Sequence, residues 1–308
     1  KPKTKKNVFI LNLSCVKINP LKLYMTQASI ITIGDELLIG QVIDTNSAWM
    51  AQELNKAGIR VARRVALADV WDEIWTALDE EQKHADIILL TGGLGPTADD
   101  ITKPLLCKYF GGKMIVHEET RQNVIEIFTK LKRPLIERNL KQAEVPDVCT
   151  VFTNKRGTAP GMLFTKEGKV FVSLPGVPHE MKGLMTDDVI PMLVKKYEFP
   201  SIIHKTLMTA GVGESFLAEL IKDFEEALPA HIKLAYLPNY GMVRLRLSAT
   251  GFNRQETENT IQQLFEKLKE LVTEYLVTDE DEPIQNVVGK LLLSKNKTMC
   301  TAESCSGG

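Results

Sequence analysis

The chain has 308 residues, 44% hydrophobic and 25% charged, a composition ordinary for a soluble globular protein of about two domains. Its net charge of −1 excludes a large basic surface for nucleic acid. The five cysteines show no disulfide-framework spacing, and no apolar run reaches the roughly 20 residues of a membrane span. We therefore expect a cytoplasmic protein that binds neither nucleic acid nor a membrane.

The first 25 residues combine a basic start with a short apolar patch, which loosely suggests a signal peptide. Lys17 and Lys22 follow the patch, however, and no cleavage site of small residues is present. We therefore do not expect export. Met25 stands just before the first clear strand, so residues 1–25 are expected to form a disordered extension.

Strand and helix patterns alternate from residue 28 onward. The sequence predicts strands at 28–34, 59–69 and 85–91, with helices at 45–58 and 71–84 between them. This βαβαβ order predicts an α/β fold with a parallel-dominated sheet flanked by helices. The carboxyl ends of the strands should then form one edge, where ligands bind in open sheets.

The third strand leads into the glycine-rich stretch "LTGGLGPTADD". Backbone amides of such a turn can converge on an anion. Asp99 and Asp100 would repel that anion unless a divalent cation lay between carboxylate and phosphate oxygens. In the alternative interpretation, Asp100 caps the helix that begins at "ITKPLL".

The first strand leads into a second polar stretch, "GDELLIGQVIDTNS". Asp35 and Glu36 should lie at the same sheet edge as the glycine-rich turn. Asp44, Thr45 and Asn46 could contact a ribose, a phosphate or a metal, or Asp44 or Asn46 could simply cap the next helix.

Residues 118–144 look helical, and "KEGK" predicts a hairpin turn before the strand that ends in "SLPGVPHEM". A further helical stretch is predicted for Glu180–Lys196, with Pro191 interrupting it. In this segment Glu180 or His179 could act as a general base. The alternative is a plain helix start with Pro178 in the first turn.

Residues 203–275 predict a small α+β unit, followed by the acidic linker "TDEDEP" and a last helix. Its loop "GVGES" lacks the lysine of a phosphate loop and the basic neighbours of an RNA-binding loop. The apolar helix face in "IQQLFEKLKELV" could support a dimer, although such faces usually pack on their own sheet. At the end of the chain, "TAESCSGG" is compatible with a nucleophile turn at Ser304.

Taken together, these motifs resemble the CinA (competence/damage-inducible protein A) family. "GDELLIGQVIDTNS", "LTGGLGPTADDIT", "NKRGTAPG", "PGVPHEM", "GVGES" and "TAESCSGG" occur in the family's order, from about Ile30 to the last residue. The resemblance implies a molybdopterin-binding-like domain at 26–200, a KH-type α+β domain at 201–277, and a linker with the start of a deamidase domain at 278–308.

The resemblance implies that the first domain hydrolyses ADP-ribose-type pyrophosphates with a divalent metal ion of unknown identity. It also implies a nicotinamide mononucleotide deamidase in full-length relatives, and we expect no deamidase activity from this chain as given. The implied partners are a nucleotide substrate and a second copy in a homodimer. A non-catalytic binding module for a pterin or nucleotide phosphate is the alternative.

Site residues follow from the matching motif positions. The catalytic residues implied are Asp99, Glu180 and Ser304, and the metal ligands implied are Asp35, Asp99 and Asp100. The substrate-binding residues implied are Gly34, Glu36, Asn46, Gly92, Gly93, Gly95, Thr97, Pro175, Gly176 and Pro178.

Overall fold

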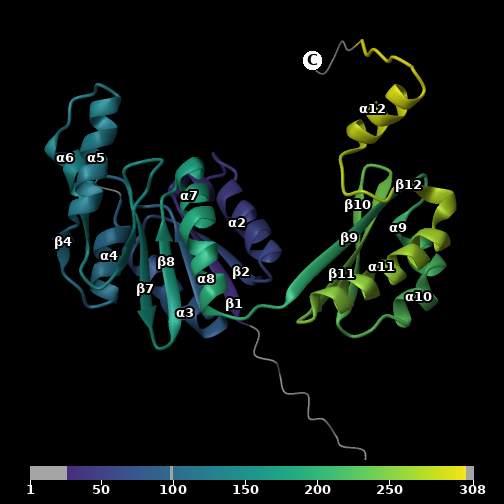
Figure 1. The fold of residues 1–308 in the computed structure, drawn as a ribbon, viewed down its shortest axis with the longest axis horizontal. Helices are drawn as coiled ribbons and strands as arrows, with labels where there is room; N and C mark the ends of the chain where they lie inside the picture. Colours follow the sequence, from purple (N-terminus) through teal and green to yellow (C-terminus); the bar gives the residue numbers. More distant parts are fainter. Residues whose placement is uncertain (1–25, 98–99, 303–308) are drawn as a thin grey trace, which may run out of the picture.

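A computed structural model describes residues 26–97 and 100–302 (Figure 1). Its larger sheet has six strands in the order β2-β1-β3-β8-β7-β6, of which the first four are parallel. The strands are β1 (Gln27–Ile33), β2 (Arg60–Leu67), β3 (Ile87–Thr91), β6 (Thr150–Phe152), β7 (Gly161–Lys166) and β8 (Lys169–Leu174). The predicted α/β class with a parallel-dominated sheet is confirmed.

Helices cover both faces of this sheet. One face carries α2 (Thr45–Lys56), α7 (Pro178–Leu184) and α8 (Ile190–Lys196), and the other carries α3 (Trp71–His84) and α4 (Thr102–Tyr109). Successive residues of a strand face opposite ways, so Ile30 packs with Met50 while its neighbour Ile31 packs with Ile74. All of these side chains are fully buried, which fixes the sheet between two layers.

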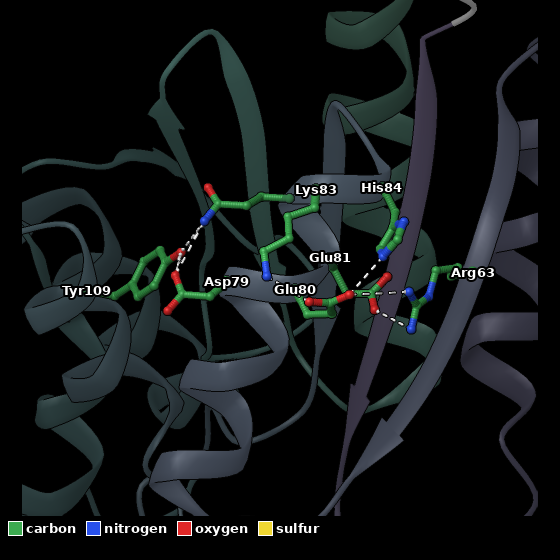
Figure 2. A network of polar contacts seen from close by, with 8 residues as sticks. Arg63, Asp79, Glu80, Glu81, Lys83, His84 and Tyr109 are labelled. Atoms are coloured by element: carbon green, nitrogen blue, oxygen red, sulfur yellow. Dashed lines mark hydrogen bonds and ion pairs between the residues drawn. The ribbon is translucent and has the colours of Figure 1, made fainter.

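A polar network links α3 to Arg63 of β2 (Figure 2) and to Ser29 of β1. The Glu81 carboxylate is almost completely buried, accepts a hydrogen bond from the Ser29 hydroxyl, and pairs with Arg63 at 3.2 Å. Glu80 pairs with Lys83 and His84 on the outer surface, and hydrogen bonds from these two side chains lower the pKa of Glu80 to about 2. Ser29 lies near the start of β1, so this network is remote from the carboxyl edge of the sheet.

Residues 112–148, here called the arm, extend from the six-stranded sheet (Figure 1). The arm contains β4 (Met114–Val116), α5 (Glu118–Lys130), α6 (Glu137–Leu140), η1 (Lys141–Ala143) and β5 (Glu144–Pro146). The stretch 118–144, expected to be helical, is helical at 118–130 and again at 137–143, with a break between. α5 ends at Lys130, and Lys132 has a positive φ of 50°. Pro134 lacks an amide hydrogen and restricts the residue before it, so a continuous helix cannot form.

The predicted hairpin joins β7 to β8, with Glu167 and Gly168 at positive φ angles of 53° and 79° as its turn requires. After β8, the predicted helical stretch is present. Between α7 and α8 lies a π-helical turn, η2 (Met185–Val189), which directly precedes the α8 segment that contains Pro191.

A second, antiparallel sheet follows in the order β10-β11-β9-β12. Its elements are β9 (Ser201–Ala210), α9 (Glu214–Leu220), α10 (Lys222–Glu226), β10 (Ile232–Asn239), β11 (Met242–Gly251), α11 (Arg254–Leu271), η3 (Thr273–Tyr275) and β12 (Leu276–Thr278). Helix α12 (Ile284–Ser294) comes after it. The apolar face of α11, including Ile261, Phe265 and Leu268, packs on this sheet. Among the described residues, no helix combines the length and apolar character needed to cross a membrane.

Candidate functional site at the carboxyl edge of the six-stranded sheet

Four parallel strands end at the same edge of the sheet and lead into four loops. Asp35 begins the short helix α1 (Asp35–Leu38) after β1, Asp69 follows β2, Gly92 follows β3, and Pro175 follows β8. This edge is the usual ligand position in open α/β sheets. The stretches "GDELLIGQVIDTNS", "LTGGLGPTADD" and "SLPGVPHEM" therefore meet at this edge of the sheet.

Asn46 and Thr91 join these loops by hydrogen bonds. The Asn46 Nδ2 donates to the carbonyl oxygen of Gly176 at 2.7 Å and to the Thr91 Oγ1 at 3.3 Å. Thr91 donates in turn to the carbonyl oxygen of Pro175 at 2.8 Å. The side chains thus hold the start of α2, the end of β3 and the loop after β8 in a fixed relation.

The loops enclose a pocket, here called the Asn46 pocket, with a cavity volume of about 120 Å³. Apolar residues such as Ile33, Leu37 and Val42 line it together with polar ones such as Asn46, and none of its described lining residues is basic. The Oδ1 of Asn46 is buried and has no hydrogen-bond donor among the described residues. A buried acceptor left without a donor costs about 1–3 kcal/mol, so this atom is well placed to receive a donor from a ligand.

Asp44 also lines this pocket, but its carboxylate is committed to the protein. It accepts hydrogen bonds from the Ser47 amide at 2.9 Å and from the Thr32 hydroxyl at 3.1 Å. Asp44 is therefore the N-cap of α2, as the alternative interpretation of the sequence allowed.

The glycine-rich loop, residues 92–97, needs its first two glycines for steric reasons. Gly92 and Gly93 have φ angles of +117° and +63°, and a Cβ on Gly92 would collide with the Ile33 carbonyl oxygen. The Gly92 amide donates to the Leu174 carbonyl at 3.1 Å. The amides of Gly93 and Leu94 have no backbone acceptor within the described part of the chain.

Asp100 binds the same loop from its other end. Its Oδ1 accepts from the Gly95 amide at 2.7 Å, and its Oδ2 accepts from the Thr97 amide at 2.9 Å and from the Thr97 hydroxyl. The side chain does not cap α4, whose N-cap is Ile101. The Asp100 carboxylate thus accepts hydrogen bonds from two of the amides that the sequence analysis expected to bind a phosphate.

Acidic side chains gather beside the loop. Burial raises the pKa of Asp69 above its usual value, a hydrogen bond from the Asp35 backbone opposes this, and the negative charges of Asp35, Glu36 and Asp100 raise the pKa further. The Asp69 amide donates to the Asp35 carboxylate at 3.3 Å. Sequence reasoning missed Asp69, although an acid directly after the second parallel strand was a usable signal.

The carboxylates of Asp35, Asp69 and Asp100 suit a hard divalent cation, because such ions prefer oxygen ligands. No group of three acidic, histidine or cysteine side chains in residues 26–97 and 100–302 has metal-binding geometry. Asp99 lies outside the described residues. The assignment of Asp35, Asp99 and Asp100 as metal ligands stays a prediction.

Glu180 lies away from the lining of the Asn46 pocket, whereas Gly176 and Pro178 contribute to it. The Glu180 carboxylate accepts a hydrogen bond from Asn154 at 2.6 Å, and a Cβ on Gly157 would collide with it. Burial raises the pKa of Glu180, while Asn154 and His179 lower it. The contacts of Glu180 are with the "NKRGTAPG" loop, and its role as general base stays a prediction.

Two other motifs lie elsewhere. The "GVGES" loop joins β9 to α9 in the second sheet, where nothing within 4 Å would oppose a side chain on Gly211 or Gly213. Ser304, the implied deamidase nucleophile, lies outside the described residues.

Comparison with known proteins gives two family matches. Residues 29–195 match the family described as "Probable molybdopterin binding domain", and residues 204–278 match "Damage-inducible protein CinA KH domain". The first match covers the six-stranded sheet with the site, and the second covers most of the antiparallel sheet with its helices.

Similar proteins include the "CinA-like protein" of Flavobacterium psychrophilum, 49% identical over 92% of this chain and 68% of the relative. The "CinA-like protein" of Cytophaga hutchinsonii is 45% identical over 91% of this chain and 67% of the relative. Among solved structures, the protein CinA "with unknown function" from Thermoplasma acidophilum is 34% identical, covering 53% of this chain and 95% of that one, with a TM-score of 0.48.

Proposed function

Because this chain belongs to the CinA family, we propose that its first domain binds a nucleotide pyrophosphate at the carboxyl edge of the six-stranded sheet and hydrolyses it. The substrate class is that of ADP-ribose, and the products would be AMP and ribose 5-phosphate. The reaction is a displacement at phosphorus by water, with a divalent cation as cofactor.

The observation that carries the proposal is the buried, unpartnered Oδ1 of Asn46 in a pocket that combines apolar and polar walls. A nucleoside presents apolar ring faces together with amino and hydroxyl donors, so it complements this lining. Asn46 cannot turn freely, because its Nδ2 is held by Gly176 and Thr91. The protein thus presents the acceptor already oriented.

The phosphates then follow the glycine-rich loop away from the pocket. Thr91 lies in the pocket lining, and the amides of Gly93 and Leu94 come two and three residues after it in the chain. These amides can donate to non-bridging phosphate oxygens and stabilise charge that develops there as the pyrophosphate bond breaks. Asp100 keeps the rest of the loop in place.

A divalent cation, when bound, supplies the positive charge that offsets both the acidic side chains and the phosphates, and it lowers the pKa of water at the site. Asp35, Asp99 and Asp100 are the proposed ligands, and Asp69 is a neighbouring acid that adds negative charge. Glu180 is proposed to accept the proton of the attacking water, and burial raises the pKa of its carboxyl above the usual value.

The test compares Asn46→Ala with Asn253→Ala in steady-state hydrolysis of ADP-ribose. Asn253 is the control, because its side chain also bonds the backbone, accepting from the Glu256 amide at 3.2 Å, and it caps α11, which packs on the second sheet. Asn46→Ala should lower kcat/KM by about 10- to 100-fold, as expected for the loss of positioning hydrogen bonds. Asn253→Ala should stay within a few-fold of wild type. Equal effects of the two substitutions would contradict the assignment of the pocket.

The second candidate function is a binding module that holds a pterin or nucleotide phosphate without turnover. It is favoured by one observation, the match of residues 29–195 to the family described as "Probable molybdopterin binding domain". Ligand affinity that needs Asn46, together with no cation-stimulated product, would select this candidate over the hydrolase.

A further inference from the structure

A second pocket opens at the far end of the glycine-rich loop. Its cavity volume is about 480 Å³, and it is lined by Pro96 and Thr97 from the loop and by Glu137, Arg138 and Lys141 from the arm. The Asn46 pocket includes Thr91, so Thr91 and Pro96, five residue steps apart, link the two pockets along the loop. That segment spans at most about 17 Å.

The two pockets differ in charge. None of the described residues that line the Asn46 pocket is basic, whereas the described lining of the second pocket has two cationic side chains and one carboxylate. The salt bridges formed by described residues of the arm involve Arg121 and Lys130. Neither Arg138 nor Lys141 forms an ion pair among the described residues. Their charges are therefore directed at solvent and at the pocket.

The glycine-rich loop cannot supply positive charge or free donors at its Gly95–Thr97 end. The amides of Gly95 and Thr97, and the Thr97 hydroxyl, already donate to Asp100. A phosphate that lies beyond Leu94 would meet a loop whose donors are satisfied and whose nearest side chain is an anion. It needs positive charge from the opposite wall, where Arg138 and Lys141 stand.

The opposite wall is held in place by one buried hydrogen bond and one exposed hydrogen bond. Lys103, only 6% exposed, donates from Nζ to the carbonyl oxygen of Gln142 at 3.0 Å, directly after Lys141. The Asn139 side chain accepts from the Ile136 amide at 3.1 Å and fixes the start of α6. The two cations therefore extend from a segment that is anchored beside α4.

We propose that Arg138 and Lys141 form an anion subsite for the distal phosphate of the substrate, the one that leaves with the sugar. This inference rests on the proposed function for the orientation of the substrate, with its nucleoside in the Asn46 pocket. It assigns the arm a role in selecting nucleoside diphosphates with a substituted distal phosphate over nucleoside monophosphates. Arg138 suits this role because its guanidinium can bind two phosphate oxygens at once.

The experiment measures the affinity of the whole 308-residue chain for ribose 5-phosphate and for AMP by calorimetry, with Mg²⁺ at one fixed concentration. Neither compound contains a pyrophosphate bond, so binding is measured without turnover. The double variant Arg138→Ala/Lys141→Ala should bind ribose 5-phosphate about tenfold or more weakly, since each lost charge-assisted hydrogen bond weakens binding several-fold or more. Its AMP affinity should stay within about twofold, because AMP lacks the distal phosphate.

The matched control is Lys130→Ala/Arg133→Ala, which removes two exposed cations from the same arm outside the pocket. It should leave both affinities unchanged, and far-ultraviolet circular dichroism checks that both double variants fold. The subsite would be overturned if Arg138→Ala/Lys141→Ala bound ribose 5-phosphate with unchanged affinity. It would also be overturned if the double variant lost affinity for AMP and not for ribose 5-phosphate. A wild-type chain that does not bind ribose 5-phosphate would overturn it too.

Failure of the proposed function gives a different result. If no cation stimulates ADP-ribose hydrolysis by the wild-type chain, the hydrolase falls, yet a charge-dependent ribose 5-phosphate site would still support the subsite. If hydrolysis is present and the double variant binds ribose 5-phosphate normally, the hydrolase stands and the subsite falls.

Discussion

At the scale of single residues, Asp100 changes how the glycine-rich stretch is understood. An acid after such a turn suggested a cation between carboxylate and phosphate. The geometry adds a second physical role, because the Asp100 carboxylate is itself an anion bound by the Gly95 and Thr97 amides. One side chain can hold the loop through these hydrogen bonds and still present a remaining lone pair to a cation.

Replacing Asp100 by alanine should release the loop. Hydrogen exchange of the Gly95 and Thr97 amides should become at least about tenfold faster, because each amide loses a charge-assisted acceptor worth roughly 1.5–3 kcal/mol. Asp147→Ala is the control, since Asp147 accepts a comparable 2.8 Å hydrogen bond from the Lys113 amide in the arm. Unchanged exchange in Asp100→Ala would show that the loop does not depend on this carboxylate.

Lys103 gives a second prediction at the residue scale, through pH. Burial lowers the pKa of Lys103 from 10.5 to about 8. Below pH 8 the folded and unfolded chains are both protonated and the full cost of burying the charge is present. As the pH rises from about 8 toward 10.5, the folded chain loses the proton first, so this cost is relieved.

The wild-type chain should therefore gain stability relative to Lys103→Met over this pH range, by up to about 3 kcal/mol at 1.36 kcal/mol per pKa unit. Urea unfolding followed by tryptophan fluorescence measures this, since all three tryptophans lie between residues 49 and 75. A difference in the free energy of unfolding between the two proteins that stays constant across this pH range would show that the pKa of Lys103 is not lowered.

At the scale of elements, the crossing of the glycine-rich loop over β1 makes a specific demand. The Gly92 Cα lies where any side chain would collide with the Ile33 carbonyl oxygen, and its φ of +117° disfavours other residues. Gly111 has a φ of +71° but open space around it. Comparing substitutions at Gly92 and Gly111 therefore separates the cost of backbone strain from the cost of steric collision.

Gly92→Ala should destabilise the first domain more than Gly111→Ala. The backbone conformation alone costs about 1–3 kcal/mol in each, and only Gly92→Ala adds the displacement of β1 or the loop. Urea unfolding of both variants, again by tryptophan fluorescence, measures the difference. Equal losses of stability would mean that the loop can move off β1 without cost.

The elements also show what the sequence could and could not predict. Periodicity predicted the helix at 71–84 with its observed bounds and placed two loop motifs at one sheet edge. It predicted a helical stretch at 118–144 but not the break around Pro134, where the backbone cannot continue the helix. The partners of Asp100 and the burial of Lys103 depend on contacts between segments, so no local pattern contained them.

At the scale of the whole molecule, the site is assembled from four strand ends and the arm, and the second sheet lies outside it. All described residues that line the Asn46 pocket and the second pocket are numbered below 200. The proposed division into a first domain of residues 26–200 and a KH-type domain of 201–277 therefore assigns the whole site to the first domain. A role for the second sheet in a homodimer remains a prediction.

The most direct test of the account is the hydrolysis of ADP-ribose by the wild-type chain, screened cation by cation against a chelator control. Chromatography should detect AMP and ribose 5-phosphate in equal amounts with at least one divalent cation, and neither product once the chelator is added. Product formation that ignores cations, or no product with any of them, would contradict the claim that the carboxyl edge of this sheet is a cation-dependent pyrophosphate hydrolase.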